Sequence, residues 1–279
     1  MPRVFTAEIA GNAFLPEKDP VSAEMLSQNA QFKLLTLKPL SEITAPEPGQ
    51  FYMIQAGTAN DPLLKRPFSV YGLQHDCLGF LYRIRGKGTL SLSQLREGDT
   101  LQVVGPLGNS YPVPSGDFIA VAGGIGIASL LPFMNKYKKR AYLFYGAMKR
   151  DELVMLEEAR ELSKEAFFTT DDGSYGQKDL ITDALRSFLS ASQIAHQALR
   201  IYACGPAPML KALSVITNAG GIVCYASLEE HMACGIGACL GCMVKVKIQK
   251  PEDRDKNKEW EYKRVCKEGP IFSLEDIKW

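Results

Sequence analysis

The sequence predicts a multidomain β plus α/β protein, and three observations support this fold class. The chain has 279 residues, more than the ~250 residues at which one hydrophobic core usually stops growing. Short apolar runs separated by Pro and Gly fill the first hundred or so residues, whereas from Asp117 apolar runs alternate with helix-like stretches. Cysteines then gather beyond residue 225. We therefore expect an antiparallel β-barrel at 1–114, a parallel-sheet α/β domain at 115–224 and a cysteine-rich domain at 225–279.

Composition narrows the function classes. Hydrophobic residues make up 46% and charged residues 23%, which excludes a disordered, collagen-like or coiled-coil chain. Lys and Arg total 32 against 31 Asp and Glu, so no global field attracts nucleic acid or an anionic membrane. The first residues do not read as a secretory signal, and the longest uncharged run, 118–135, is Gly-rich and too short for a membrane helix. We expect a soluble, cytoplasmic protein without membrane insertion.

Each predicted element follows from its local pattern. The barrel strands are short apolar runs bounded by turn residues, at 32–37, 50–54, 67–71 and 78–84. The parallel strands are expected at 118–122, 141–145, 167–170 and 200–203, with helices at 127–138, 151–165, 179–189 and 208–218. In the last domain we expect strands at 243–248 and 262–265, with the charged stretch 250–259 as the hairpin tip.

Four of the seven cysteines carry the most specific motif. They follow the C-x4-C-x2-C…C arrangement of plant-type [2Fe–2S] ferredoxins, as Cys234, Cys239, Cys242 and Cys266. Neighbouring glycines allow the backbone to wrap closely and to aim N–H groups at sulfur. A structural zinc site or unliganded core cysteines remain the alternatives. The other three cysteines lie in or beside apolar strands, where a buried thiol is the usual explanation: Cys77, Cys204 and Cys224.

Two glycine-containing turns point to a nucleotide. The first, Gly123-Gly124-Ile125-Gly126-Ile127, passes from a strand into a helix, so a pyrophosphate could approach the helix N–H groups. The alternative is a tight turn under a close helix–strand contact. The second turn, 203–209, ends another strand. Because open α/β sheets bind ligands at the carboxyl edge, both turns are expected to face one crevice.

Two segments of the barrel region suit a phosphate-bearing cofactor. Arg66-Pro67-Phe68-Ser69 supplies a fixed cation, a stiff backbone and a hydroxyl, which suit a flavin's pyrophosphate and ring edge. It could equally be a strand with a rim arginine. The segment 83–90 ends a strand in a glycine turn before a short helical stretch, and could hold a phosphate at a helix N-terminus.

These motifs occur in the order seen in ferredoxin reductase-like flavoproteins. The last part is more specific, because residues 229–242 and 264–272 closely resemble the family of electron transfer subunits of class 1B dihydroorotate dehydrogenases. The likeness covers the chain from about Gln31 to Trp279. It implies a ferredoxin reductase-like fold with an FAD-binding barrel, an NAD-binding α/β domain and a C-terminal [2Fe–2S] domain. It also implies a role in pyrimidine biosynthesis with a separate FMN-containing catalytic subunit, as a heterotetramer.

The resemblance also implies site residues. Those expected to contact FAD are Arg66, Pro67, Phe68, Ser69, Leu81, Tyr82, Arg83, Gly88 and Thr89. Those expected to face NAD are Gly123, Gly124, Gly126, Ile127, Cys204, Gly205, Pro206 and Met209. The cluster ligands would be Cys234, Cys239, Cys242 and Cys266.

The physical logic of such a chain is electron conversion. NAD exchanges hydride, whereas a [2Fe–2S] cluster passes single electrons, and a flavin between them connects the two. Electrons from the partner's FMN would cross the cluster, collect on FAD and leave as hydride to NAD+. No catalytic acid or base is expected here, since hydride transfer depends on the orientation of two rings. The rivals are a flavin/iron–sulfur NAD(P)H reductase serving a ferredoxin, an oxygenase or sulfur, and a non-redox, zinc-stabilised interaction module.

Overall fold

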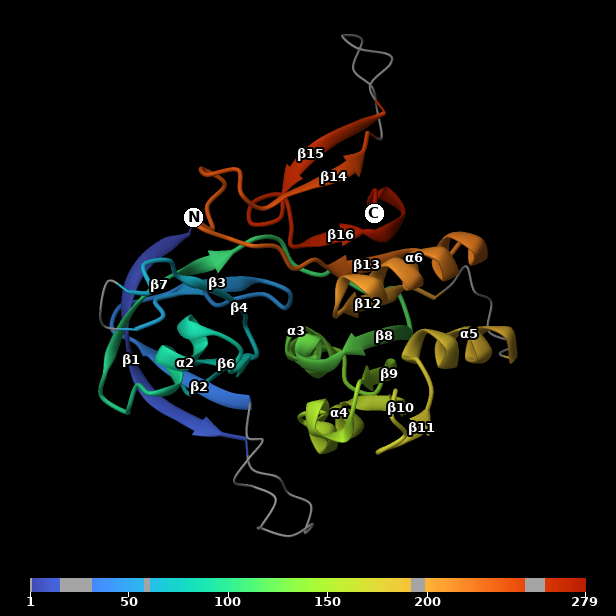
Figure 1. Ribbon diagram of the computed structural model, residues 1–279, viewed down its shortest axis with the longest axis horizontal. Coiled ribbons are helices and arrows are strands. Elements are labelled where there is room, and N and C mark those ends of the chain that lie inside the picture. The colour runs from blue at the N-terminus through green and yellow to red at the C-terminus, as the bar shows by residue number, and fades with distance from the viewer. Residues whose placement is uncertain (1, 16–31, 58–60, 192–198, 249–258) are drawn as a thin grey trace.

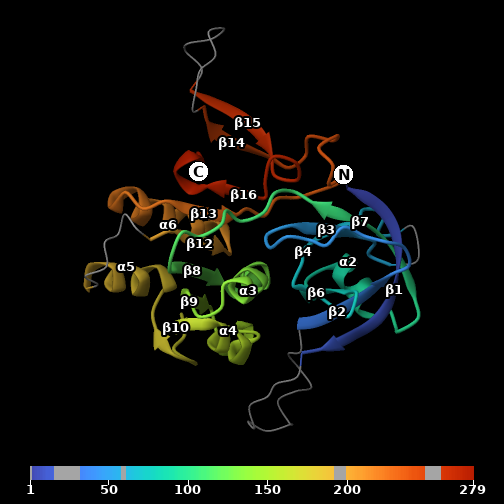
Figure 2. The ribbon, with the colours of Figure 1, turned by 180° about the vertical axis from the view of Figure 1, so that it is seen from behind.

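The structure, a computed structural model, describes residues 2–15, 32–57, 61–191, 199–248 and 259–279. A curled antiparallel sheet and a parallel α/β sheet lie side by side, and a small C-terminal hairpin lies above both (Figure 1 and Figure 2). An antiparallel sheet followed by a parallel α/β sheet is the arrangement that the sequence predicts. Among the described residues, no helix is long and apolar enough to cross a membrane.

The N-terminal half-barrel is a seven-stranded antiparallel sheet in the order β4-β3-β7-β1-β2-β6-β5. Its strands are β1 (Arg3–Phe14), β2 (Phe32–Pro39), β3 (Phe51–Ile54), β4 (Arg66–Ser69), β5 (Gly72–Gln74), β6 (Cys77–Arg83) and β7 (Thr100–Leu107), and α2 (Lys87–Ser93) follows β6. Alternate residues of β1, among them Phe5 and Ile9, point into the core. The expected strands are confirmed, but β1 and β7, which fill the centre of the sheet, were not among them.

The α/β domain has a sheet in the order β11-β10-β9-β8-β12-β13-β16. Its strands are β8 (Phe118–Gly123), β9 (Ala141–Ala147), β10 (Ser163–Thr170), β11 (Gln177–Lys178), β12 (Ile201–Cys204), β13 (Cys224–Ser227) and β16 (Ile271–Ser273). All neighbouring strands are parallel except β13 and β16. Helices α5 (Ile181–Ala191) and α6 (Ala207–Gly220) cover one face, and α3 (Ile127–Lys136) and α4 (Leu156–Leu162) cover the other.

One predicted helix is shorter than expected. The single helix expected at 151–165 is wrong, because the structure has a 3-10 turn, η2 (Arg150–Glu152), followed by the short helix α4. Met155 adopts a left-handed backbone (φ 56°) between them, which interrupts any continuous helix. Residues from Ser163 onward instead join β10 and pair with β9. The last residues of the predicted helix thus form a β-strand.

The C-terminal segment belongs partly to the α/β domain. The expected hairpin is confirmed as β14 (Met243–Lys247) and β15 (Trp260–Arg264), while its charged tip lies outside the described residues except for Glu259. However, β16 adds to the edge of the α/β sheet beside β13, and η4 (Leu274–Asp276) follows it. The division proposed at residue 225 therefore falls inside a strand of the parallel sheet.

Polar contacts join the barrel to the α/β domain, among them two that involve α4 or the turn before it. Arg83 at the end of β6 places Nη2 2.9 Å from Oε1 of Glu152, whose side chain is only 8% exposed. The Arg83 guanidinium also lies over the Phe32 ring. In addition, the Tyr71 hydroxyl donates a hydrogen bond to Glu158 on α4. These contacts hold the half-barrel and the α/β domain in one relative position.

The ion pair gives a stability prediction. Arg83→Met leaves the Glu152 carboxylate buried without this cation and is expected to lower the free energy of unfolding by about 2–3 kcal/mol, less than for a fully buried pair because Arg83 is half-exposed. Denaturant unfolding of the flavin-free protein measures this. Arg186→Met, which removes an exposed pair with Asp183, is the control and should cost under about 1 kcal/mol. Equal losses in the two variants would contradict the assignment.

Candidate functional site

The two glycine-containing turns meet at the carboxyl edge of the parallel sheet. Strands β8 and β12 are parallel neighbours, with Ala122 paired to Cys204, so the turns that follow them lie together. The backbones touch: a Cβ on Gly126 would overlap the Cys204 carbonyl oxygen, and one on Gly205 would lie 3.0 Å from Gly123 Cα. The structure thus brings together the turns that the sequence placed at one crevice, and glycine is required for this approach.

The turn after β8 leaves backbone open to a ligand. It forms the 3-10 turn η1 (Gly124–Gly126) before α3. Gly124 has a left-handed backbone (φ +52°), and nothing lies within 4 Å of where its Cβ would be. Pro206 is exposed and Met209 is half-buried, whereas the side chains of Ile127 and Cys204 are buried. A nucleotide in this crevice would therefore contact the backbone of the first turn and the rim of the second.

The barrel contributes an arginine at a helix N-terminus. All four residues of β4 are half-buried. The Arg66 guanidinium lies directly over Gly88, since a Cβ there would be 2.6 Å from Arg66 Nε. At the start of α2, Thr89 Oγ1 accepts hydrogen bonds from the N–H groups of Arg85 (2.9 Å) and Gly86 (3.2 Å). A guanidinium beside the N–H groups of a helix start fits the diphosphate of FAD.

The other expected FAD residues lie deeper. Leu81 and Tyr82 are buried in the half-barrel, 4% and 2% exposed. The Tyr82 hydroxyl donates to Asn12 Oδ1 at 2.9 Å, and its ring packs edge-on against Phe68. Arg83 is half-buried and pairs with Glu152. Leu81 and Tyr82 can therefore offer a cofactor little more than backbone, and their role as FAD contacts stays a prediction.

The four motif cysteines lie together as two pairs. The Cys239 N–H donates to Cys234 Sγ at 3.4 Å, and the Cys266 N–H donates to Cys242 Sγ at 3.4 Å. Cys239 is exposed, whereas Cys242 and Cys266 are each only 2% exposed. Cys234 is therefore paired with Cys239 within the loop, and Cys242 is paired with Cys266, which lies far along the chain.

The pairing fits a cluster with two irons. A [2Fe–2S] cluster takes two protein ligands on each iron, whereas zinc gathers four sulfurs about one point at about 2.3 Å. In the part of the chain that the structure describes, no three His, Cys, Asp or Glu side chains converge to hold a single metal ion. The donor set is four thiols, which suits iron–sulfur chemistry. The two pairs of cysteines therefore match the two-plus-two ligand arrangement of a [2Fe–2S] cluster.

Backbone N–H groups prepare the first ligand for this role. Burial of the Cys234 thiol raises its pKa, but N–H donation from Cys239 and Ile236 outweighs burial, so the pKa falls to about 6. The Gly241 N–H also points at Cys239 Sγ, at 3.5 Å. Thiolate is the form that binds metal, so this loop favours the ligating state. The sequence-based argument from glycine-rich wrapping is confirmed here.

The cysteine loop is seated on the barrel by one glycine. Gly235 has a left-handed backbone (φ +71°), and a Cβ on it would overlap Met53 Cγ on β3. The far side of the loop is held by Arg264, which donates to the Gly237 carbonyl oxygen at 3.0 Å and pairs with Glu268. The loop is therefore fixed between the barrel and its own hairpin.

Glu229 was not singled out from the sequence as a site residue, whereas Arg85 lies in the segment 83–90 that the sequence suggested for a phosphate. Glu229 follows β13, and the negative charge of its carboxyl acts on Cys204. The residue is exposed overall, but desolvation of its carboxyl raises the pKa, and the charge of Arg85 from the barrel opposes this. The rule that ligands bind at the carboxyl ends of parallel strands could have identified Glu229.

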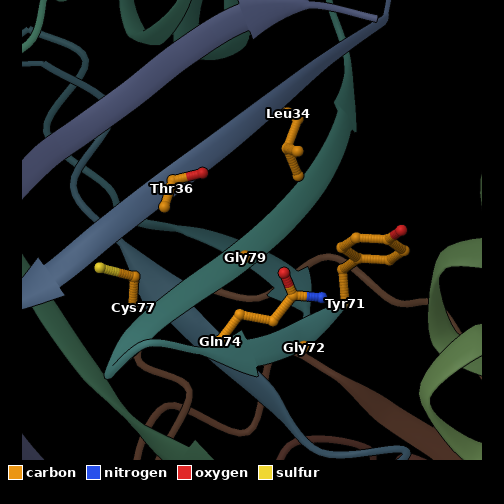
Figure 3. A pocket seen from close by; sticks show the side chains of 7 residues that line it. All are labelled: Leu34, Thr36, Tyr71, Gly72, Gln74, Cys77 and Gly79. Atoms are coloured by element: carbon orange, nitrogen blue, oxygen red, sulfur yellow. The ribbon is translucent and has the colours of Figure 1, made fainter. Parts of the chain in front are cut away.

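A shallow pocket lies elsewhere, on β2, β5 and β6 of the half-barrel (Figure 3). It is lined by Leu34, Thr36, Tyr71, Gly72, Gln74, Cys77 and Gly79. None of the expected cofactor residues lines it. The pocket is therefore separate from the junction of the glycine turns.

Comparison with protein families identifies two segments. Residues 229–278 match the iron–sulfur cluster binding domain of dihydroorotate dehydrogenase B. Residues 120–214 match an oxidoreductase NAD-binding domain. These segments contain the cysteine loop and both glycine-containing turns.

Similarity extends over most of the chain. The electron transfer subunit of dihydroorotate dehydrogenase B (NAD+) from Caldanaerobacter subterraneus subsp. tengcongensis is 41% identical over 233 residues, 83% of this chain and 87% of that protein. A solved NADH-dependent reduced ferredoxin-NADP oxidoreductase, described in connection with flavin-based electron bifurcation, has a TM-score of 0.78 at 27% identity, covering 98% of this chain and 90% of that one. A ferredoxin NADP+ reductase from Neisseria gonorrhoeae with bound FAD and NADP shares the fold, with a TM-score of 0.58 at 15% identity over 78% of this chain and 92% of that one.

The position of Arg66 predicts a loss of flavin affinity. Arg66→Ala removes a charge-assisted contact of about 1.5–3 kcal/mol, so FAD is expected to bind about 10–100-fold more weakly to the apoprotein. Fluorescence titration with FAD measures the change. Arg3→Ala, which alters an exposed arginine of the same sheet, is the control and should bind FAD normally. Unchanged affinity in Arg66→Ala would remove Arg66 from the site.

The contact between Gly235 and Met53 predicts a loss of iron and of stability when Gly235 is substituted. Gly235→Ala combines a left-handed backbone with overlap on Met53, so we expect lower iron content and a lower melting temperature. Gly221→Ala is the matched control, because Gly221 has a similar φ of +60° with open space around it, and there the cost is about 1 kcal/mol. If both variants lose the same stability and keep full iron, the contact with Met53 does not seat the loop.

Proposed function

The chain belongs to the family of electron transfer subunits of NAD-dependent dihydroorotate dehydrogenase B, and on this basis we propose that it passes electrons from a dihydroorotate-oxidising partner to NAD+. It is an oxidoreductase subunit whose cofactors are FAD and an iron–sulfur cluster, with NAD as substrate. The observation that carries the proposal is that the cysteine loop lies against β3, which pairs with the Arg66 strand, while the two glycine turns of the α/β domain lie against each other.

Each of these groups of residues has one task in this proposal. Arg66 and the start of α2 bind the FAD diphosphate, while Phe68 and Ser69 border its ring. The backbone at Gly124 and the rim at Pro206 and Met209 receive the nicotinamide nucleotide. The four cysteines hold the cluster through their thiolates. Together these cofactors convert single electrons from the cluster into a hydride on NAD+.

The protein's contribution to this chemistry is orientation. Hydride transfer needs two rings held face to face. The close approach of the turns at Gly123 and Gly205 would set the position of the nucleotide at the carboxyl edge of the parallel sheet. No proton donor or acceptor of this chain is required. Proton abstraction from dihydroorotate falls to the partner subunit.

The relatives' name, electron transfer subunit, implies a catalytic partner. We propose that this partner contains FMN, that the assembly is a heterotetramer in the cytoplasm, and that it serves pyrimidine biosynthesis. The supporting feature is an exposed side of the cysteine loop, where Ile236 and Leu240 are 53% and 58% exposed beside Cys239. A partner over this loop would bring its own redox group near the cluster.

Reconstitution tests the proposal. The chain loaded with FAD and iron–sulfur is mixed with a dihydroorotate-oxidising, FMN-containing subunit, and NADH formation from dihydroorotate and NAD+ is followed at 340 nm. We expect activity only with both subunits, and a stable complex on gel filtration. If the chain instead transfers electrons from NADH to a ferredoxin and ignores the partner, it is a reductase for another acceptor.

A ligand variant tests the order of the carriers. Cys239→Ser is expected to weaken or remove the cluster and abolish most dihydroorotate-dependent NADH formation, while NADH still reduces FAD at close to the normal rate, because that step does not use the cluster. Stopped-flow flavin absorbance separates the two steps. Cys77→Ser, in β6 of the barrel, should leave both unchanged. Equal loss of both steps in folded Cys239→Ser would contradict the order.

A further inference from the structure

Two buried side chains of the barrel lie against the cysteine loop at Gly235. Gly235, which directly follows the cluster ligand Cys234, rests on Met53 of β3 and Leu107 of β7. A Cβ on Gly235 would overlap Met53 Cγ and lie 3.1 Å from its Sδ and 3.3 Å from Leu107 Cδ1. Met53 is 1% exposed and Leu107 is 3% exposed. The loop backbone and the barrel are therefore in direct contact, with no space for water between them.

Of these two side chains, Met53 leads to the candidate FAD strand. Met53 pairs with Pro67 across the β3–β4 ladder. Leu107 lies on β7, which is separated from β4 by β3. From Cys234 the sequence of contacts is thus one covalent step to Gly235, one packing contact to Met53, and one strand pairing to Pro67 beside Phe68. Among these contacts of the described residues, the route through Met53 is the shortest between the cysteine loop and β4.

The Met53 contact also forms part of a continuous core. Met53, Cys242 and Cys266 belong to the same cluster of buried residues, and Met232, from the segment before the loop, packs against it. A methionine is suited to this place because its unbranched, flexible side chain fills irregular gaps. The absence of a side chain on Gly235 is what allows the thioether to lie against the loop backbone.

We propose that Met53 is the positioning residue of the electron step between the cluster and FAD. This inference rests on the proposed function, because it assumes both cofactors. In each transfer from NADH-reduced protein the flavin loses one electron and the cluster gains it, and no bond to a protein atom forms or breaks. Electrons tunnel less readily across empty space than across packed atoms. A cavity at Met53, or a loop shifted away from β3, therefore slows the transfer.

Two substitutions at Met53 separate packing from sulfur chemistry. Met53→Ala removes most of the side chain and leaves a cavity, whereas Met53→Leu nearly conserves the volume. The anaerobic protein is mixed with NADH, flavin reduction is followed by absorbance, and cluster reduction by freeze-quench EPR. We expect several-fold slower cluster reduction in Met53→Ala, with normal flavin reduction. Met53→Leu should restore the rate.

Further readouts exclude a general structural effect. Iron content, flavin content and the two midpoint potentials of Met53→Ala should match those of the unsubstituted protein. Met134→Ala is the matched control, since Met134 is 0% exposed on α3 and belongs to a different core. A normal rate in Met53→Ala, an equal slowing in Met134→Ala, or a slowing explained by a shifted potential or lost iron would overturn the inference.

The assay also separates this inference from the proposed function. It uses NADH as the electron source and the chain's own cluster as acceptor, so no partner subunit is needed. If the dihydroorotate-oxidising subunit fails to bind but Met53→Ala still slows cluster reduction, the proposed function is wrong and the role of Met53 is supported. If the partner binds and the chain turns over, but Met53→Ala is normal, only the inference about Met53 is wrong.

Discussion

The three parts of the chain share one hydrophobic core, and the relative position of every candidate cofactor site depends on it. Its members run from Ile201 in the parallel sheet, through Phe272 of β16 and Cys266, to Met53 in the barrel. A one-electron carrier and a two-electron carrier can exchange electrons only when they are held close together. Burial of these apolar side chains supplies a fixed arrangement in place of separate modules on linkers. Two of the four motif cysteines, Cys242 and Cys266, are thus part of the core that joins the domains.

Hydrogen bonds fix the orientation of the C-terminal segment relative to the barrel. Asn109, just beyond β7, donates to the carbonyl oxygens of Glu268 (3.1 Å) and Ile271 (2.9 Å), and its Oδ1 accepts the N–H of Ile271. Because Ile271 begins β16, the same side chain links the barrel's exit to an edge strand of the parallel sheet. Apolar burial is not directional, so such bonds are what select one orientation of the C-terminal segment.

On the other side of the junction, charged groups hold the barrel and the α/β domain. Arg83 approaches Glu152, and Tyr71 donates to Glu158. A buried carboxylate is costly unless it is paired, so this contact favours one domain arrangement over many. The half-barrel, which carries the candidate FAD strand, and the α/β domain, which carries the two glycine turns, are therefore held in one relative position. This arrangement suits two rings that must meet at contact distance.

Most of the fold and part of the candidate site could be predicted from local sequence patterns. Strand runs such as Phe118–Gly123 and the spacing of Cys234, Cys239 and Cys242 are local patterns, because strand periodicity and ligand geometry both act over a few residues. The central strand β1 was missed, although its alternation at Phe5, Ala7 and Ile9 was present as a signal. The helix expected at 151–165 failed because pairing with β9 outweighed local preference.

The sequence by itself determined the order of the domains, the spacing of the four cysteines proposed as cluster ligands, and the two glycine turns. Only the tertiary structure decided which strands are neighbours, that β16 returns to the parallel sheet, and that Gly235 rests on Met53. It also placed Glu229 beside Cys204 and Arg85. The physical reason is that spacing along the chain fixes local geometry, whereas contacts between distant residues follow from how the whole chain buries its apolar surface and pairs its polar groups.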